Sequence, residues 1–421
     1  MEAQANIFQL FLVFLKIGTF SFGGGHAMIP LIEKELVKKR KWITEDTMKY
    51  MIAISETTPG PVAINMATFV GYRLKKLWGA FIATFGVVFS PVLIIIIIGF
   101  VLTHLLDNTY FNVVLQGFRL GAIVLISHSV IIIFKKTTKS FFGFLLIILG
   151  LTISLLTKAN ALVVMILLLA YLVIESIMVI PHENRMPFLS KIRAVKGKES
   201  AKPKTTNKKI PIFIFMVVGV LSLLYGLVFI AGIKPGLNIL RDSGIFFLVS
   251  LFTIGGGHAM IPMMESFLVH FKVIPYDILL NLAAIAESTP GPFSVNMATV
   301  VGLFEGGKMA ILGGVLTSIS IILPSFIIIV FVARHFDRFI QNKVIRRTLG
   351  YLLALVVGLL MTVVFEAGKR DLYISKQFQY KEAIILGVLY FMSFTRIRGR
   401  EMNHIFILFF GAIFTSILYL L

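Results

Sequence analysis

An eight-residue sequence occurs twice in this chain and limits its fold more than any other feature. Residues 23–30 read GGGHAMIP, and residues 255–262 read GGGHAMIP again. The similarity resumes downstream, where ETTPGP at residues 56–61 matches ESTPGP at residues 287–292. An exact repeat of this length indicates a fused duplication, so the two halves are expected to share one fold.

Composition places both halves in a membrane. Of the 421 residues, 57% are hydrophobic and only 14% are charged, and the mean hydropathy is +0.93. Soluble chains run at roughly 45–50% apolar and about 25% charged residues, which excludes a soluble enzyme. A spanning helix needs roughly 20 apolar residues, so the chain has room for about ten to fourteen spans. We therefore expect an all-α, multi-pass membrane protein, with the lipid bilayer as its partner.

A polar segment divides the chain. Residues 181–210 carry nine Lys or Arg against two Glu, as cytoplasmic loops do. The predicted domains are a first transmembrane repeat at 1–180, a basic cytoplasmic linker at 181–210, and a second transmembrane repeat at 211–421. The second repeat begins with one extra apolar helix at 211–231, which would turn it upside down relative to the first.

The distribution of bases supports this inversion. With the N-terminus inside, the basic clusters at 34–41 and 73–76 and the linker all fall inside, as the positive-inside rule requires. The stretch 265–276, the counterpart of the 34–41 cluster, would lie outside and has lost nearly all its bases. The predicted fold is thus two inverted-topology repeats with broken or re-entrant helices at GGGH and TPGP. Whether these regions cross the membrane or re-enter stays open.

The GGGH and TPGP motifs break helices within apolar segments. Three glycines do not hold a stable helix, and each proline removes a backbone donor. We expect new helices to start at Ala27 and Val62, with free amides that form natural anion sites. Inverted repeats with such breaks are typical of transporters, so the breaks predict a midplane site for an inorganic oxyanion. The structural alternative is close helix packing at GGGH and a tight turn at TPGP.

The candidate substrate-binding residues lie at the breaks of both halves. The two histidines of GGGH would contact substrate or a proton, or would be buried groups with ordinary partners. The two asparagines after TPGP would donate to the oxyanion, or cap and bridge helices. The full set is Gly24, Gly25, His26, Thr57, Thr58, Gly60 and Asn65 in the first half, and Gly256, Gly257, His258, Ser288, Thr289, Gly291 and Asn296 in the second.

Glu56 and Glu287 stand just before the TPGP turns and are candidates for proton coupling. A carboxylate beside a dianion in low dielectric is strongly unfavourable, and burial also favours the neutral acid. Each Glu is therefore expected to carry a proton when anion is bound. The alternatives are a cation site, with Na⁺ as the coupling ion, and a structural pairing, for instance with Lys16. Lys16 is either a snorkelling residue or a counter-charge, and His128 is expected to face the bundle interior in a structural role.

Further residues around the motifs extend the pattern, namely Trp42, the Asn-Met-Ala-Thr run at 65–68 and 296–299, and Gly-Tyr-Arg at 71–73. With FGGGHAMIP and TPGP, they resemble the chromate transporter family in its long, two-domain form. The resemblance implies transport of a tetrahedral dianion, chromate or sulfate, across the bacterial plasma membrane, usually as chromate efflux, by two oppositely oriented halves. The chain departs from the family pattern at both GGGH histidines, where Tyr is frequent, and at both glutamates before TPGP, where Gln is frequent. These departures leave the transported anion and the coupling ion open.

Other function classes find little support. The sequence contains no P-loop, no HExxH motif and no cysteine, so it predicts no enzyme, no cofactor and no metal site. No nucleic-acid partner is expected despite the formal charge of +20, because the bases lie in short clusters between apolar segments. A proton-coupled secondary transporter is the leading interpretation. The alternatives are a passive anion channel on the same scaffold and an intramembrane enzyme acting on lipid-linked phosphates. A homodimer is an open option.

Overall fold

The computed structural model describes residues 5–21, 24–105, 108–137, 141–157, 238–269, 271–334, 343–374, 377–397, 400–402 and 404–420. The basic linker at 181–210 and the predicted extra apolar helix at 211–231 lie outside these residues. Within the described part the chain is helical, apart from two antiparallel pairs of two-residue strands.

The two halves present their elements in the same order. The first half contains α1 (Ile7–Phe20), α2 (Gly24–Glu33), the π-helical turn η1 (Lys34–Lys39), α3 (Glu45–Thr57), α4 (Val62–Leu105), α5 (Thr109–Thr137) and α6 (Phe141–Thr157). The second half contains α10 (Asn238–Phe252), η2 (His258–Met260), α11 (Ile261–Met264), η3 (Glu265–Val269), α12 (Tyr276–Ser288), α13 (Phe293–Glu305), η4 (Gly307–Met309), α14 (Ala310–Arg334), α16 (Lys343–Leu372), β1 (Tyr373–Ile374), β2 (Gln377–Phe378), α17 (Tyr380–Phe394), β3 (Arg396–Ile397), β4 (Arg400–Glu401) and α18 (His404–Leu420).

Helix α4 is a hairpin of two arms. Its backbone leaves the helical region at Lys75 and Lys76, and the hydroxyls of Thr68 and Thr84, on opposite sides of this bend, are 2.7 Å apart. In the second half α13 and α14 form the matching hairpin, in which the hydroxyls of Thr299 and Ser318 are also 2.7 Å apart. The repeat seen in the sequence therefore extends to the packing of these arms.

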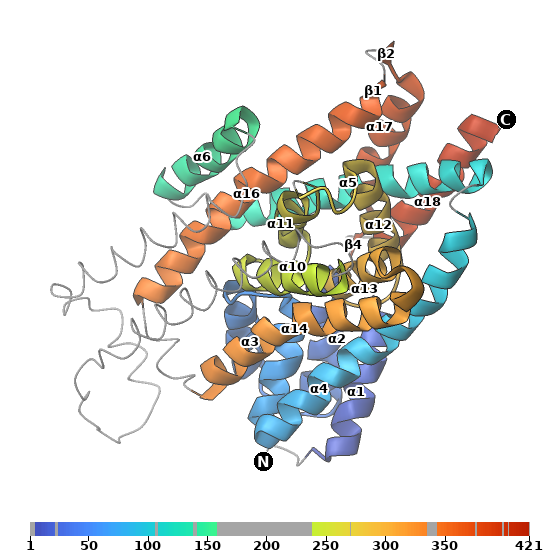
Figure 1. Ribbon diagram of the computed structural model, residues 1–421. Helices are drawn as coiled ribbons and strands as arrows, with labels where there is room; N and C mark the ends of the chain where they lie inside the picture. Colours follow the sequence, from blue (N-terminus) through green and yellow to red (C-terminus); the bar gives the residue numbers. More distant parts are fainter. Residues whose placement is uncertain are drawn as a thin grey trace.

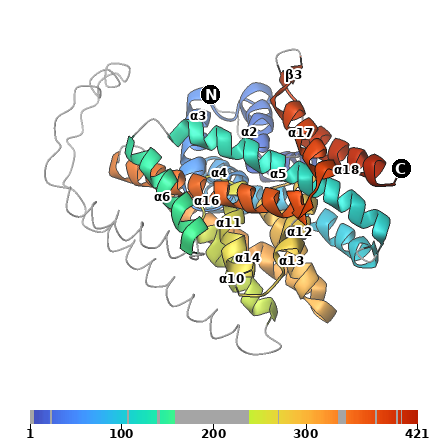
Figure 2. The same ribbon diagram turned by 90° about the horizontal axis from the view of Figure 1, so that it is seen from above.

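The helices of the two halves interlock. Each first helix packs on the long arm of its own half, α1 on α4 and α10 on α14, while α4 packs on α14 and α5 on α16 across the halves. Figure 1 shows α10–α13 between α1 and α4 on one side and α5 and α16 on the other. In Figure 2, α2 and α3 lie towards the upper edge and α10 and α14 towards the lower edge. The main apolar core runs through this junction and includes Phe14, Phe69, Phe246 and Phe267.

The outer surface is apolar, as a bilayer requires. The long arm of α4 exposes a row of large side chains, among them Phe81, Phe85 and Ile97, and α14 exposes Ile319 and Ile327. Such continuous apolar surface is not found on soluble monomers. Three described helical stretches are long and apolar enough to cross a membrane, namely Val62–Val101, Tyr110–Lys135 and Gly307–Arg334. The first of these includes the bend at Lys75 and Lys76, and its arm after the bend supplies most of the length. The protein is thus an all-α membrane protein.

Candidate functional site

The TPGP turns are two sharp breaks at matching places. Helix α3 ends at Thr57 and α4 begins at Val62, as predicted, while α12 ends at Ser288 and α13 begins at Phe293. The glycines of the turns have φ values of 101° at Gly60 and 114° at Gly291. L-residues with a side chain avoid this region, so glycine is needed for the backbone to reverse here.

The two breaks are joined by exchanged hydrogen bonds. Gly60 N–H donates to the carbonyl of Thr253 at 2.9 Å, and Gly291 N–H donates to the carbonyl of Ser21 at 2.8 Å. Ser21 and Thr253 stand at matching positions, two residues before each Gly triplet. Each TPGP turn therefore binds the backbone that leads into the GGGH motif of the other half. This exchange, in which each half gives and receives the same bond, is the property of a two-fold related contact.

Side-chain packing follows the same exchange. A Cβ added to Gly60 would overlap Ser325 of α14, and a Cβ added to Gly291 would overlap Pro91 of α4, both well inside 3.0 Å. Each turn is therefore pressed against the long arm of the opposite half, and only glycine allows so close an approach.

The two asparagines hold the TPGP turns together. Asn65 Nδ2 lies 3.1 Å from the carbonyl of Ser55 and within 3.3 Å of three further acceptors on Thr58 and Pro59. Asn296 Nδ2 repeats this with Ala286, Thr289 and Pro290. Both amide groups thus donate into their own turns. Each Oδ1 is buried and lacks a partner among the described residues.

The hydroxyls of the TPGP regions also bond within their own halves. Thr58 donates to the carbonyl of Ile54 at 2.8 Å, Ser288 to that of Ile285 at 2.9 Å, and Thr289 to that of Ala286 at 3.1 Å. These bonds satisfy carbonyls at the ends of α3 and α12. The side chain of Thr57 lies outside the described part of the structure.

The GGGH motif differs between the halves. In the second half Gly255 and Gly256 have φ values of 102° and 108°, and helical structure begins only at His258. In the first half α2 begins at Gly24, so the predicted start at Ala27 is wrong by three residues. The first amides of a helix have no intrahelical hydrogen-bond partners. Gly24 and Gly25 can therefore lie in the first turn of α2. The side chain of His26 lies outside the described residues.

His258 is held between the two halves. Its Nε2 lies 2.9 Å from Oε2 of Glu287, and its Nδ1 lies 2.9 Å from Oγ of Ser129 on α5. His258 is 8% exposed and Glu287 only 2%, and the imidazole packs on the ring of Phe293 at the start of α13. Oε1 of Glu287 is buried and lacks a partner among the described residues. The sequence singled out His258 and Glu287 separately, and the structure joins them into a pair supported by Ser129.

The partner of Lys16 is Glu35, a residue that the sequence analysis did not single out. Lys16 and Lys39 each place Nζ 3.0 Å from Oε1 of Glu35. Although burial favours the neutral acid, the hydrogen bonds from Lys16 and Lys39 outweigh it and hold the pKa of Glu35 below its ordinary value. Lys16 therefore acts as a counter-charge. Glu56, the counterpart of Glu287, is partly exposed.

A second charged cluster was also missed. Arg119 of α5 pairs with the buried Asp371 at the end of α16. Glu382 of α17 accepts from Gln116 at 2.9 Å and from the hydroxyl of Tyr419. These contacts tie four helices together. Arg119 lies within an apolar stretch of the sequence at 117–134, where an ionisable residue is itself a signal of a buried partner.

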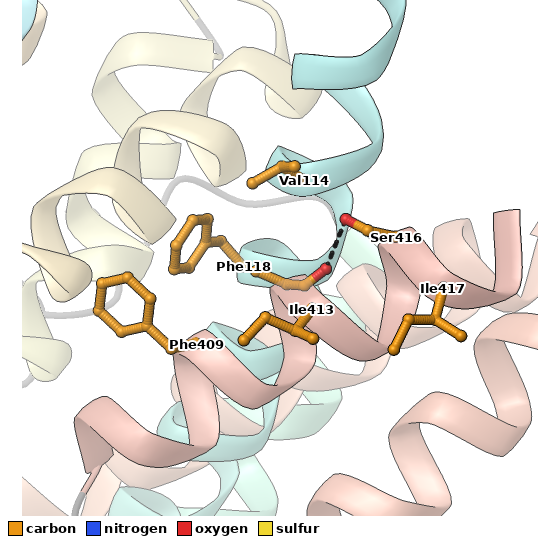
Figure 3. A pocket seen from close by; sticks show the side chains of 7 residues that line it. Val114, Phe118, Phe409, Ile413, Ser416 and Ile417 are labelled. Atoms are coloured by element: carbon orange, nitrogen blue, oxygen red, sulfur yellow. Dashed lines mark hydrogen bonds between the residues drawn. The ribbon is translucent and has the colours of Figure 1, made fainter. Parts of the chain in front are cut away.

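Two apolar hollows on the surface do not suit an anion. One, of about 600 Å³, lies between α5 and α18 and includes Phe118 and Phe409. Figure 3 shows its single hydroxyl, Ser416, directed at the backbone of its own helix, where it bonds the carbonyl of Ala412 at 2.8 Å. The other, of about 580 Å³, lies between α4 and α14 and is lined mainly by Phe, Val, Leu and Ile. A dianion would lose its hydration in either hollow without gaining a charged partner.

Comparisons with known proteins agree with these features. The family model described as chromate transporter matches residues 8–174 and 243–416. A chromate transport protein of Pseudomonas aeruginosa is 26% identical over 357 residues, covering 84% of this chain and 79% of its own. An uncharacterized transporter of Methanocaldococcus jannaschii is 25% identical over 376 residues, covering 86% and 85%. A chromate transport protein of Cupriavidus metallidurans is 23% identical over 369 residues, covering 86% and 83%. No solved structure is significantly similar to the chain.

Proposed function

Because the chain belongs to the chromate transporter family, we propose that it is a proton-coupled secondary transporter of a chromate- or sulfate-like oxyanion in the plasma membrane. The relatives named as chromate transport proteins support this substrate class. The observation that carries the proposal is the buried His258–Glu287 pair, which adjoins the turns where the two halves exchange hydrogen bonds. An intramembrane carboxyl and imidazole beside an anion site supply a proton-binding group for coupled transport.

We propose that the repeats at 1–180 and 211–421 are inverted and joined by the cytoplasmic linker at 181–210. The exchanged contacts of Gly60 and Gly291 support a two-fold relation between them. Helix lengths favour re-entrant hairpins over full crossings. The sixteen residues of α2 and the adjoining η1 extend at most about 24 Å and the thirteen of α3 about 20 Å, whereas the hydrocarbon core is about 30 Å thick.

The anion site is proposed at the N-terminal ends of α4 and α13, between the TPGP turns and the GGGH motifs. In the described conformation the amides of Gly60 and Gly291 bind carbonyl oxygens. Those carbonyls occupy the place that an anion oxygen would take, so opening either bond would free a donor at a helix N-terminus. Asn65 and Asn296 position the turns, since their donors are already used and a free Oδ1 does not attract an anion.

Glu287 is proposed to carry the coupled proton. Nε2–H of a neutral His258 can donate to Oε2 of Glu287 while Ser129 donates to Nδ1, which leaves Oε1 free to take a proton. Protonation removes the charge that would otherwise repel the arriving dianion. Glu56 is the matching group of the first half.

The test is transport by the purified chain in liposomes with radiolabelled sulfate and chromate. Accumulation driven by an inward proton gradient, together with anion exchange in its absence, is the expected result. A voltage-driven current without accumulation would instead establish a channel. Failure to move either anion under any gradient would contradict the proposal.

A further inference from the structure

Three of the eight histidines of the chain, His258, His128 and His404, lie on elements that contact the helix carrying Glu287. His258 bonds Glu287 directly, and α12, which carries Glu287, packs on both α5 and α18, which carry His128 and His404. The ring of His128, on α5, lies edge-on to the ring of His404, with 6.0 Å between their centroids. The three histidines come from η2, α5 and α18, so the fold and not a local motif brings them together.

His128 and Ser129 are neighbours on α5, and their side chains contact different partners. Ser129 contacts His258, whereas His128 contacts His404 and the ring of Phe394, 5.8 Å away. Among the titratable groups, His258 contacts Glu287, and the ring of His128 contacts that of His404. The histidines and the carboxyl therefore form one connected cluster.

The cluster leads to one edge of the protein. His404 is the first residue of α18, is partly exposed, and follows the β3–β4 pair with Arg396 and Arg400. Figure 2 places β3 at the upper edge of the molecule, towards which α2 and α3 also lie. By its basic residues this edge is the one expected to face the cytoplasm. Glu287 is fully enclosed at the other end of the cluster.

We propose that His404 and His128 form a proton relay between the cytoplasmic side and the Glu287–His258 pair. This proposal rests on the proposed function and adds the route that its proton takes. His404 takes a proton from water at the basic edge and passes it, through a bridging water, to the free Oε1 of Glu287. His404 then returns to its neutral form. His128 belongs to the relay because it packs edge-on against His404 and orients its ring, and Ser129 donates to Nδ1 of neutral His258 and so keeps its hydrogen on Nε2.

The relay belongs to one half. Helix α16, the counterpart of α5, contains no histidine, so nothing on it matches His128. The coupled proton is assigned to the second-half site.

The experiment uses the full chain in liposomes and the variants His404→Gln and His128→Gln. Both Gln variants keep a polar side chain but cannot carry a proton. Tyr390→Phe is the matched control, because it removes the 2.6 Å hydrogen bond to Ser127 on the same stretch of α5 without touching a histidine. Sulfate and chromate are assayed in two ways, as accumulation under a proton gradient and as anion exchange without one.

We expect His404→Gln to lower gradient-driven accumulation about a hundredfold or more, the lower end of the loss typical of a removed acid–base group. His128→Gln should lower it by a smaller factor. Anion exchange should stay within about twofold of the unmodified protein in both variants, because exchange requires no net proton movement. Tyr390→Phe should retain both activities.

Two results would overturn the relay. Gradient-driven accumulation equal to that of the unmodified protein in both histidine variants would remove the route. Parallel loss of exchange and accumulation in His404→Gln would show a structural role. If Glu287→Gln abolishes accumulation while both histidine variants retain it, the proposed function stands and the relay falls. If the unmodified protein accumulates neither anion, the proposed function itself fails.

Discussion

Replacing Gly60 or Gly291 by Ala should strongly destabilise the protein. Both glycines have φ values above 100°, where a residue with a side chain pays about 1–2 kcal/mol of steric strain. The added Cβ would also overlap Ser325 or Pro91, and overpacking of this kind costs about 1–3 kcal/mol. The expected loss is therefore about 2–5 kcal/mol for each variant.

Two other glycines allow the cost of backbone strain to be separated from the cost of steric overlap. Gly307 has a φ of 51° and open space around its Cβ position, so Gly307→Ala should show only the strain of the backbone, about 1 kcal/mol. Gly387 is helical and also open, so Gly387→Ala should be neutral or stabilising by about 0.5–1 kcal/mol. The measurement is the thermal unfolding midpoint of the detergent-solubilised protein. Midpoints for Gly60→Ala and Gly291→Ala that match Gly307→Ala would show that the turns are not pressed against the opposite half.

Four further predictions follow from the same contacts. Asn65→Ala and Asn296→Ala should each lower stability by about 1–3 kcal/mol in the same unfolding assay, because several carbonyls of the turn lose their donor; an unchanged midpoint would contradict this role. Because the pKa of Glu35 is lowered in the folded protein, its pairing should stabilise above the ordinary carboxyl pKa and weaken as pH falls through the folded value. Glu35→Gln should therefore flatten the acid dependence of the midpoint, and an identical pH profile would refute this. Single cysteines at Lys38 and Lys272 in this cysteine-free chain should be labelled from opposite sides of the membrane, and labelling from one side would exclude inverted repeats. Transport should rise as pH falls, and Glu287→Gln should retain anion exchange but lose this pH dependence; retention of the full pH profile would show that Glu287 does not carry the proton.

The sequence predicts much of the helical framework because local chemistry decides it. Pro59, Gly60 and Pro61 exclude a continuous helix, so the start of α4 at Val62 follows from the sequence. The apolar stretch of the sequence at 141–157 coincides with α6, and that at 402–420 begins only two residues before α18. The sequence predicts the start of α2 three residues too late, because the prediction excludes the glycines from the helix. The first turn of a helix tolerates glycine.

The partners within the site could not be predicted in the same way. Gly60 and Thr253 lie in different halves, and no periodic pattern of residues links a backbone amide to a carbonyl so far away in the chain. The sequence offered two roles for the asparagines, and only the folded geometry shows that their amides donate into the turn. Ser129 carries no signal of its own, because a serine in an apolar helix usually bonds its own backbone.

The exchanged bonds give a physical reason for the two halves to be used together. A half on its own would bury the amide of its TPGP glycine without an acceptor, because that acceptor is Thr253 for Gly60 and Ser21 for Gly291. Each orphaned donor costs about 1–3 kcal/mol, which is a large share of the stability of a domain. The contact of His258 with Ser129 also crosses the halves. The amides of Gly60 and Gly291 thus find their acceptors in the opposite half, so a change in one turn acts on the GGGH region of its counterpart.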